Sequence, residues 1–161
     1  MTLPTAGYHL DGDAGDAWWF LDTRMTVKVG GRQSAGGLTV IDFSAPPGFG
    51  PPRHVHAAED EVFYVLAGEL QVVCGDRDWA AGPGSLVFLP RAVEHAFVVT
   101  GDAPVHALQL TTPAGFEDYL AEVGRPPGTP GLPPPSVPDV GRLAEVSARY
   151  GTSLVGPPLS A

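Results

Sequence analysis

Cysteine and long apolar runs are scarce in this sequence of 161 residues. The single cysteine, Cys74, excludes a disulfide within the chain and gives no support for an oxidising compartment. No stretch approaches the roughly 18 consecutive apolar residues that span a membrane. The first residues also lack the basic start and apolar centre of a signal peptide. We therefore expect a cytoplasmic protein without a membrane partner.

Positive charge is scarce as well. The chain has 9 Lys and Arg against 18 Asp and Glu, which gives a formal net charge of -9. Such a charge repels phosphate backbones and anionic lipid surfaces. The composition therefore argues against nucleic acid as a partner, but it does not indicate what the protein binds.

Glycine and proline, by contrast, are abundant. The chain contains 21 Gly and 18 Pro, and 43% of its residues are hydrophobic. This composition is too apolar for a disordered protein and too rich in turn formers for a helical bundle. Because the length suits one domain with a single core, we expect a one-domain protein of the all-β class.

Short apolar or alternating runs, separated by turn signals, follow one another through most of the chain. About nine or ten such strands indicate a closed or double-layered antiparallel fold, and we predict a jelly-roll barrel. The clearest predicted strands are 17–22, 25–29, 37–44, 61–66, 69–74, 76–80, 85–89, 95–100 and 105–111.

The periodicity changes beyond Pro113. Apolar residues at helical spacing predict one helix over 115–123 and a second from the capping residue Asp139 to Tyr150, with a proline-rich linker between them. We expect these helices to cover the barrel or a partner subunit. The predicted division of the chain is an N-terminal arm at 1–16, a β-barrel at 17–112 and a C-terminal helical extension at 113–161.

Potential metal ligands are concentrated after a proline-rich loop. His54 and His56 are two residues apart, so on a strand both imidazoles point to the same face. Three carboxylates follow at Glu59, Asp60 and Glu61, of which the last begins an apolar run. A hairpin-like unit could therefore bring two imidazoles and a carboxylate together.

These residues resemble the first conserved motif of the cupin superfamily. The spacing from Gly48 to His54, His56, Glu61 and Gly68 fits that motif at each fixed position, which selects Glu61 among the three carboxylates. The resemblance implies the cupin fold, a jelly-roll barrel also called a double-stranded β-helix.

The second cupin motif is matched in part, by Gly84, Pro90 and His95. The glycine that usually follows two residues after the proline is Ala92, and the terminal asparagine is Val99. The departures concern the turn and a position beyond the ligand, so the resemblance still implies that His95 completes the metal site.

The resemblance thus implies a metal site of His54, His56, Glu61 and His95. Mixed imidazole and carboxylate donors suit one divalent transition ion, and iron, nickel, manganese, cobalt, copper and zinc all remain open. Four protein ligands leave one or two positions free for water, dioxygen or a chelating substrate.

Strand alternation predicts what surrounds such a site. If Glu61 and His95 point into the barrel, the residues two and four positions after each share that orientation. The predicted pocket residues are Phe63, Val65, Phe97 and Val99. They favour a small apolar or aromatic ligand with an oxygen donor over a sugar or a free amino acid.

A closer likeness lies within the cupins. The segments PPRHVHAAEDEVFYVLAGEL, GFEDYLAEVG and RLAEVSARYGTSLVGPPL resemble small single-cupin proteins related to bacterial quercetin 2,3-dioxygenase. The resemblance implies that a flavonol hydroxyl binds the metal, that Glu61 takes its proton as ligand and catalytic base, and that dioxygen cleaves the heterocycle with release of carbon monoxide.

We therefore expect a mononuclear metal-dependent dioxygenase that acts on a flavonol-like or other enolisable aromatic substrate. One alternative is a metal-dependent isomerase, cyclase or lyase of natural-product metabolism, and another is a cupin that binds a small molecule without turnover. Cupins commonly dimerise, so we also expect a homodimer.

Overall fold

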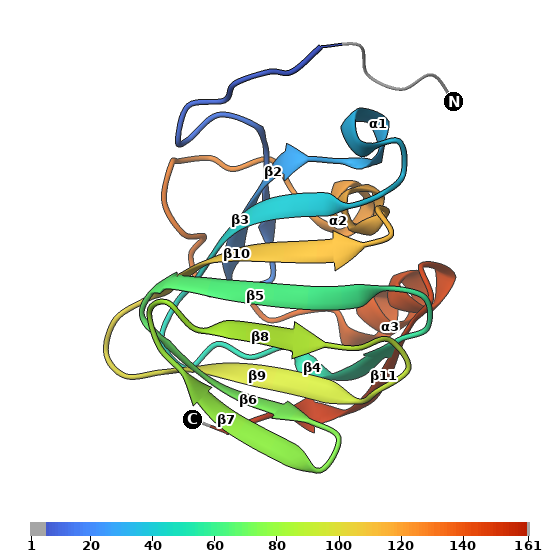
Figure 1. Cartoon of the computed structure of the whole chain (residues 1–161). Coiled ribbons are helices and arrows are strands. Elements are labelled where there is room, and N and C mark those ends of the chain that lie inside the picture. Colours follow the sequence, from blue (N-terminus) through green and yellow to red (C-terminus); the bar gives the residue numbers. More distant parts are fainter. Residues whose placement is uncertain (1–5, 161) are drawn as a thin grey trace.

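Two antiparallel β-sheets pack face to face in the computed structural model of the protein, which describes residues 6–160 (Figure 1). The predicted all-β jelly roll is confirmed. The six-stranded sheet has the order β1-β2-β3-β10-β5-β8, with strands Asp16–Phe20 (β1), Thr23–Val29 (β2), Thr39–Ala45 (β3), Val105–Thr112 (β10), Asp60–Ala67 (β5) and Leu86–Leu89 (β8). The five-stranded sheet has the order β11-β4-β9-β6-β7, with strands Thr152–Pro158 (β11), Pro52–His56 (β4), His95–Thr100 (β9), Glu69–Cys74 (β6) and Arg77–Ala81 (β7).

Alternation of buried and more exposed residues explains why these segments form two layers. In β3 and β10 every second side chain is buried, which is the pattern of a strand with one face on the core. Phe43 and Phe63 from one sheet meet Phe97 from the other, with ring centroids 5.1 to 5.8 Å apart in edge-to-face arrangements. Such contacts add about 0.5–1.5 kcal/mol per pair beyond the area they bury, so these rings join the two sheets.

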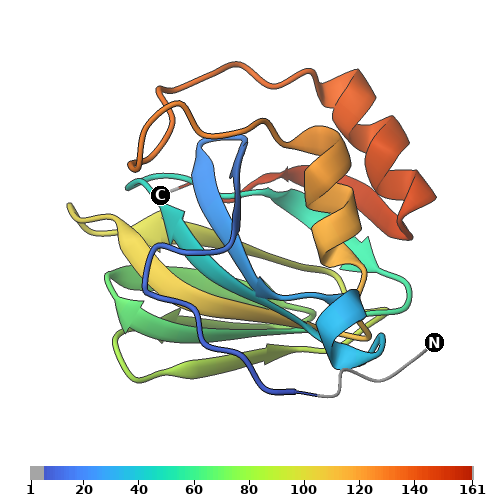
Figure 2. The ribbon, with the colours of Figure 1, turned by 90° about the horizontal axis from the view of Figure 1, so that it is seen from above.

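Helices cover one side of the two sheets (Figure 2). The short α1 (Gly31–Ser34) lies in the connection from β2 to β3, while α2 (Phe116–Val123) and α3 (Val140–Arg149) lie between β10 and β11. The predicted cap is present, because the Asp139 side chain accepts a hydrogen bond from the Arg142 amide at 3.0 Å. The buried apolar residues of α2 and α3 belong to the main hydrophobic core.

The C-terminal segment contains a strand that the sequence analysis did not predict. β11 pairs antiparallel with β4, with Thr152 opposite His56 and Leu154 opposite His54. Its pairing becomes irregular near Gly156 and Pro158, and these residue types weaken a strand signal. The segment after residue 113 is therefore more than a helical appendage, since its end extends a sheet. In the described part of the chain, no helix is long and apolar enough to cross a membrane.

Candidate metal centre

Four buried side chains converge between the two sheets. The four predicted ligands His54, His56, Glu61 and His95 each offer one ligand atom, and these atoms all lie within 4.8 Å of one another. Their exposed fractions are 8%, 2%, 3% and 1%. The structure thus brings together the side chains that the sequence selected, and their arrangement could hold a metal ion.

Strand geometry places each of these groups. His54 and His56 alternate with the less buried Val55 on β4, so both imidazoles point inward. β9 is the neighbour of β4 in the same sheet, where His95 is the direct partner of His54. Glu61 comes from β5 in the opposite sheet. The three imidazoles therefore face a carboxylate across the barrel interior.

Backbone carbonyls hold the outer nitrogens of two histidines. Nδ1 of His54 lies 2.7 Å from the Pro52 carbonyl oxygen, and Nδ1 of His95 lies 3.0 Å from that of Val93. A carbonyl can only accept, so both Nδ1 atoms carry the proton and donate it. In neutral rings of this tautomer, Nε2 has a free lone pair that can bind a metal.

The third histidine is held by side chains. Nδ1 of His56 lies 3.0 Å from the Thr152 hydroxyl oxygen on β11 and 3.2 Å from the Glu59 carboxylate. Because the carboxylate accepts, Nδ1 again carries the proton. Glu59 thus touches the outer edge of the imidazole, whereas Glu61 lies on the inner side with the Nε2 atoms. The third candidate carboxylate, Asp60, instead forms an ion pair with Arg91 at 2.8 Å.

Glu61 is fixed by a residue that the sequence analysis did not identify. The side-chain amide of Gln109 on β10 donates a hydrogen bond of 2.5 Å to Glu61 Oε1. The other carboxylate oxygen, Oε2, lies 3.3 Å from His95 Nε2 and 3.9 Å from His56 Nε2. Gln109 therefore leaves one oxygen of Glu61 directed at the imidazoles.

The pKa values of Glu61 and His54 are shifted in directions that suit metal ligation. Burial raises the pKa of Glu61, but the interaction with His95 and the charges of His56 and His54 outweigh it and lower this pKa to about 2. Burial lowers the pKa of His54 to about 4. At His56 burial again acts to lower the pKa, but the hydrogen bond to Glu59 and the two nearby carboxylates raise it above the ordinary value. Near neutral pH the carboxylate is thus ionised and His54 is neutral, as metal ligation requires.

Two of the inner histidine nitrogens have no hydrogen-bond partner among the residues described. Nε2 of His56 and Nε2 of His95 are both buried and have no hydrogen-bond partner within residues 6–160. Buried polar atoms nearly always have a partner, so two orphaned acceptors that face one carboxylate call for a cation between them. The donor set of three imidazoles and one carboxylate fits a divalent transition ion.

The turn before β9 compensates for the departure from the second cupin motif. Ala92, which stands where the motif has glycine, adopts the left-handed conformation with φ of 62°. Its amide donates a hydrogen bond of 2.8 Å to the His56 carbonyl oxygen. The turn is therefore built as glycine would build it, at a backbone cost of roughly 1–2 kcal/mol for a residue with a Cβ.

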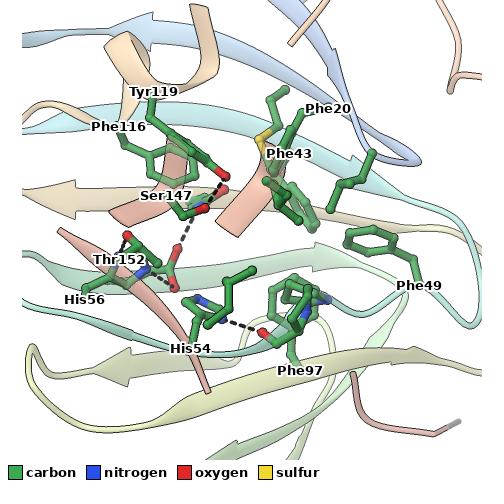
Figure 3. Close-up of a pocket in the computed structure, with 18 of the residues that line it drawn as sticks. Phe20, Phe43, Phe49, His54, His56, Phe97, Phe116, Tyr119, Ser147 and Thr152 are labelled. Carbon is green, nitrogen blue, oxygen red and sulfur yellow. Dashed lines mark hydrogen bonds and ion pairs between the residues drawn. The ribbon is translucent and has the colours of Figure 1, made fainter. Parts of the chain in front are cut away.

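An aromatic cavity of about 70 Å³ adjoins the cluster (Figure 3). Of the four predicted pocket residues, Phe63 and Phe97 line it, while Val65 and Val99 are completely buried in the core. Other aromatic residues in its wall are Phe20, Phe43, Phe49 and Phe116. Polar residues that the sequence analysis did not predict are Gln109, Tyr119, Ser147 and Thr152, and they come from β10, α2, α3 and β11.

Comparison with known proteins agrees with this architecture. The family model described as the Cupin domain matches residues 42–111, a range that includes the four clustered side chains. A search of the curated proteins finds none that matches the chain.

Several solved structures share the fold. KdgF from Halomonas sp. is similar with a TM-score of 0.59 and 15% identity, over 70% of this chain and 99% of its own. A predicted oxalate decarboxylase from Thermotoga maritima has a TM-score of 0.54 and 21% identity, over 56% of this chain and 80% of its own. The cupin domain of Cnp3 from Schizosaccharomyces pombe has a TM-score of 0.52 and 12% identity, over 65% of this chain and 74% of its own. At such identities the likeness establishes the fold alone.

Proposed function

We propose that the protein is a metal-dependent enzyme of the cupin superfamily, because the Cupin domain model matches residues 42–111. Its substrate is a small, largely apolar aromatic molecule that carries an oxygen donor. The observation that supports this most is the position of the cluster, because the inner nitrogens of three histidines and one oxygen of Glu61 meet beside a cavity with an aromatic wall. Metal donors next to an apolar cavity are typical of a catalytic site with an open coordination position.

The chain's own residues have distinct tasks in this proposal. His54, His56 and His95 would hold the ion through Nε2, while their Nδ1 partners keep each ring oriented. A bound divalent ion would act as a Lewis acid that acidifies a substrate hydroxyl and, if redox-active, would support dioxygen chemistry. The aromatic wall excludes water and holds the ring of the substrate.

We propose a ring-cleaving dioxygenase as the leading reaction, with an enolisable aromatic compound as substrate. Support comes from the resemblance of the sequence to quercetin dioxygenase-like cupins and from the aromatic wall. Glu61 Oε2, which faces the inner nitrogens of His95 and His56, is the carboxylate oxygen that would take the proton of a substrate hydroxyl. Its lowered pKa keeps this carboxylate ionised near neutral pH, as a metal ligand requires.

The volume of the cavity limits the size of the substrate. Its volume of about 70 Å³ is well below the roughly 300–1,000 Å³ of typical small-molecule sites. A flavonol has three rings and would require several wall residues to move, whereas a single-ring compound would require less. The volume therefore favours a single-ring enolisable aromatic over the flavonol itself.

A non-redox isomerase, cyclase or lyase is the second candidate. The observation that favours it is the pair of hydroxyl groups of Tyr119 and Ser147 in the cavity wall, because such groups can deliver a proton to a substrate. A dioxygenase has less need of them.

Oxygen consumption distinguishes these reactions. The protein is loaded with iron(II) or nickel(II) and mixed with 3-hydroxyflavone or maltol, which are enolisable and differ in size, while an electrode records dioxygen. We expect uptake that depends on metal and substrate and that is lost in His54→Ala but kept in His106→Ala, because His106 lies outside the cluster and pairs with Asp42. Conversion of a substrate without uptake would support the non-redox enzyme, and binding without conversion would support a non-catalytic cupin.

A further inference from the structure

We infer that the cavity contains a second recognition point, which binds a hydroxyl group of the substrate away from the metal. It consists of Gln109, Tyr119 and Ser147, and we call it the hydroxyl subsite. The inference rests on the proposed function, because it assumes that the metal centre holds a first oxygen of the same molecule. It narrows the substrate class to aromatic rings that carry a metal-binding oxygen and a further hydroxyl.

Two hydroxyl groups meet in the cavity wall (Figure 3). The Tyr119 hydroxyl oxygen on α2 lies 3.1 Å from that of Ser147 on α3, and the two residues are only 8% and 1% exposed. One hydroxyl proton is used within this pair, so the other remains able to donate. No further side-chain hydrogen bond occupies the pair in the part of the chain that the structure describes. A buried O–H donor with no acceptor is costly, and a ligand oxygen would satisfy it.

Gln109 supplies the complementary acceptor. Its amide nitrogen donates to Glu61 Oε1, and because a carboxylate only accepts, the amide must present its nitrogen there. The amide oxygen is then turned away from Glu61, and it is buried without a partner among residues 6–160. Gln109 is only 3% exposed and lines the same cavity as the hydroxyl pair.

A substrate hydroxyl matches both halves of this arrangement. It can donate its proton to the Gln109 amide oxygen and accept one from the Tyr119 and Ser147 pair. The remaining wall near the phenylalanine rings offers little polar competition. A site of this kind rejects an analogue that lacks the hydroxyl, since its own buried polar groups then stay unpaired.

The hydroxyl pair also has a structural role, which a control variant must separate from ligand binding. Tyr119 and Ser147 also join α2 to α3, so their hydrogen bond contributes to the packing of these helices. Tyr150 joins the same part of the chain from outside the cavity, because its hydroxyl donates to Glu122 on α2 at 2.9 Å. Tyr150→Phe is therefore a matched control that removes a link between the same elements.

Three small probes test the subsite on the cobalt(II)-loaded protein. Allomaltol has an α-hydroxyketone that chelates metals, kojic acid adds one hydroxyl on a one-carbon arm, and the hydroxyethyl homologue carries it on a two-carbon arm. Visible absorption of the cobalt ion reports the affinity of each. We expect wild type to prefer at least one hydroxylated probe over allomaltol by roughly 3- to 10-fold, the effect of one net hydrogen bond.

The variants decide where this preference arises. In Tyr119→Phe and in Ser147→Ala we expect the preference to fall to about one while the affinity for allomaltol is kept, and in Tyr150→Phe we expect no change. Equal affinity of wild type for all three probes, or a preference that survives in both cavity variants, would overturn the subsite but leave the proposed function standing. If none of the probes binds the cobalt-loaded wild type, the proposed function itself fails, and the subsite with it.

Discussion

At the scale of single residues, the division of labour between the two nitrogens of each histidine organises the site. Every Nδ1 has a partner on the outside, and the Nε2 atoms of His56 and His95 face the interior without one in the described residues. Outer partners of this kind commonly change metal affinity by 10–100-fold when removed. The inner nitrogens are thus held in an arrangement that could bind a cation.

Replacement of Gln109 tests most directly how the site orients Glu61. Gln109→Leu removes the hydrogen bond to Glu61 and leaves a buried carboxylate oxygen without its donor. We expect the free energy of unfolding of the metal-free protein to fall by about 1–3 kcal/mol, and the metal affinity to fall as Glu61 loses its orientation. Chemical denaturation and cobalt(II) titration measure the two effects.

Gln71→Leu is the control for this substitution. Gln71 lies on β6 and donates to Asp78 at 3.2 Å near the surface, so the change should affect neither quantity by more than about 0.5 kcal/mol. If Gln109→Leu behaves like this control, Gln109 does not position Glu61.

The sequence could predict the four clustered side chains but not the groups that surround them. His54, His56 and Glu61 are close in the chain, and a known spacing ties His95 to them. Gln109 lies at an inward position of β10, where Thr111 is also polar and buried, and nothing in the spacing of the sequence distinguishes it as a partner of Glu61. Tyr119 and Ser147 meet only because α2 and α3 pack together, and that contact spans 28 residues of chain.

At the scale of secondary structure, β11 connects the C-terminal segment to the candidate metal centre. It extends the sheet next to β4, and Thr152 at its start contacts the outer nitrogen of His56. Most barrel strands and both longer helices could be predicted, because alternation and helical periodicity are local signals, whereas the proline-flanked β4 was not among the predicted strands. β11 could not be predicted, because its stability comes from pairing with a strand almost a hundred residues earlier, as the contact between His56 and Thr152 with its separation of 96 residues illustrates.

Thr152→Val tests this connection. The substitution keeps the shape of the side chain but removes the hydroxyl that holds His56 Nδ1, while Glu59 still contacts this nitrogen. We expect the metal affinity to fall about 10-fold, at the lower end of such effects, with little change in the folded structure. Isothermal titration with zinc(II) measures it. Ser153→Val changes the exposed neighbour on the same strand and should leave the affinity unchanged; a similar loss in both variants would mean that only strand pairing matters.

Glu117 ties the start of α2 to neighbouring segments through hydrogen bonds, as Thr152 ties β11 to His56. Its carboxylate accepts hydrogen bonds from the Gly31 amide at 2.5 Å, from the Gly115 amide at 3.0 Å and from the Thr39 hydroxyl. Burial raises the pKa of Glu117, but these hydrogen bonds outweigh it and lower the pKa below its ordinary value. The folded state therefore favours the ionised form, and this stabilisation is present above the ordinary pKa and lost as the pH falls through the lowered one.

Glu117→Gln should consequently change the pH dependence of stability. At neutral pH we expect a loss of about 1–2 kcal/mol in the free energy of unfolding, and this difference from wild type should shrink as the pH falls from about 5 towards 3. Denaturation of both proteins across this range measures it. Glu145→Gln, at an exposed position of α3, should follow wild type throughout. A difference for Glu117→Gln that stays constant with pH would show that its charge is unimportant.

At the scale of the whole molecule, the jelly-roll barrel and the C-terminal segment both contribute residues to the candidate site. Both sheets supply the metal cluster, while α2, α3 and β11 complete the wall of the cavity. A ligand larger than this cavity of about 70 Å³ would therefore require side chains of the wall to move. The homodimer, the cytoplasmic location and the division into three segments stay predictions, and light scattering would test the first.

Metal content is the measurement that tests the central claim most directly. Purified protein is stripped with a chelator, titrated with cobalt(II) and analysed for bound metal, with His106→Ala as a control outside the cluster. We predict one ion per chain for wild type and for the control, loss of binding in His54→Ala and His95→Ala, and a stabilisation of about 2.7 kcal/mol when free metal exceeds the dissociation constant 100-fold. Wild type that binds no ion, or binds it equally well after either histidine is removed, would contradict the account.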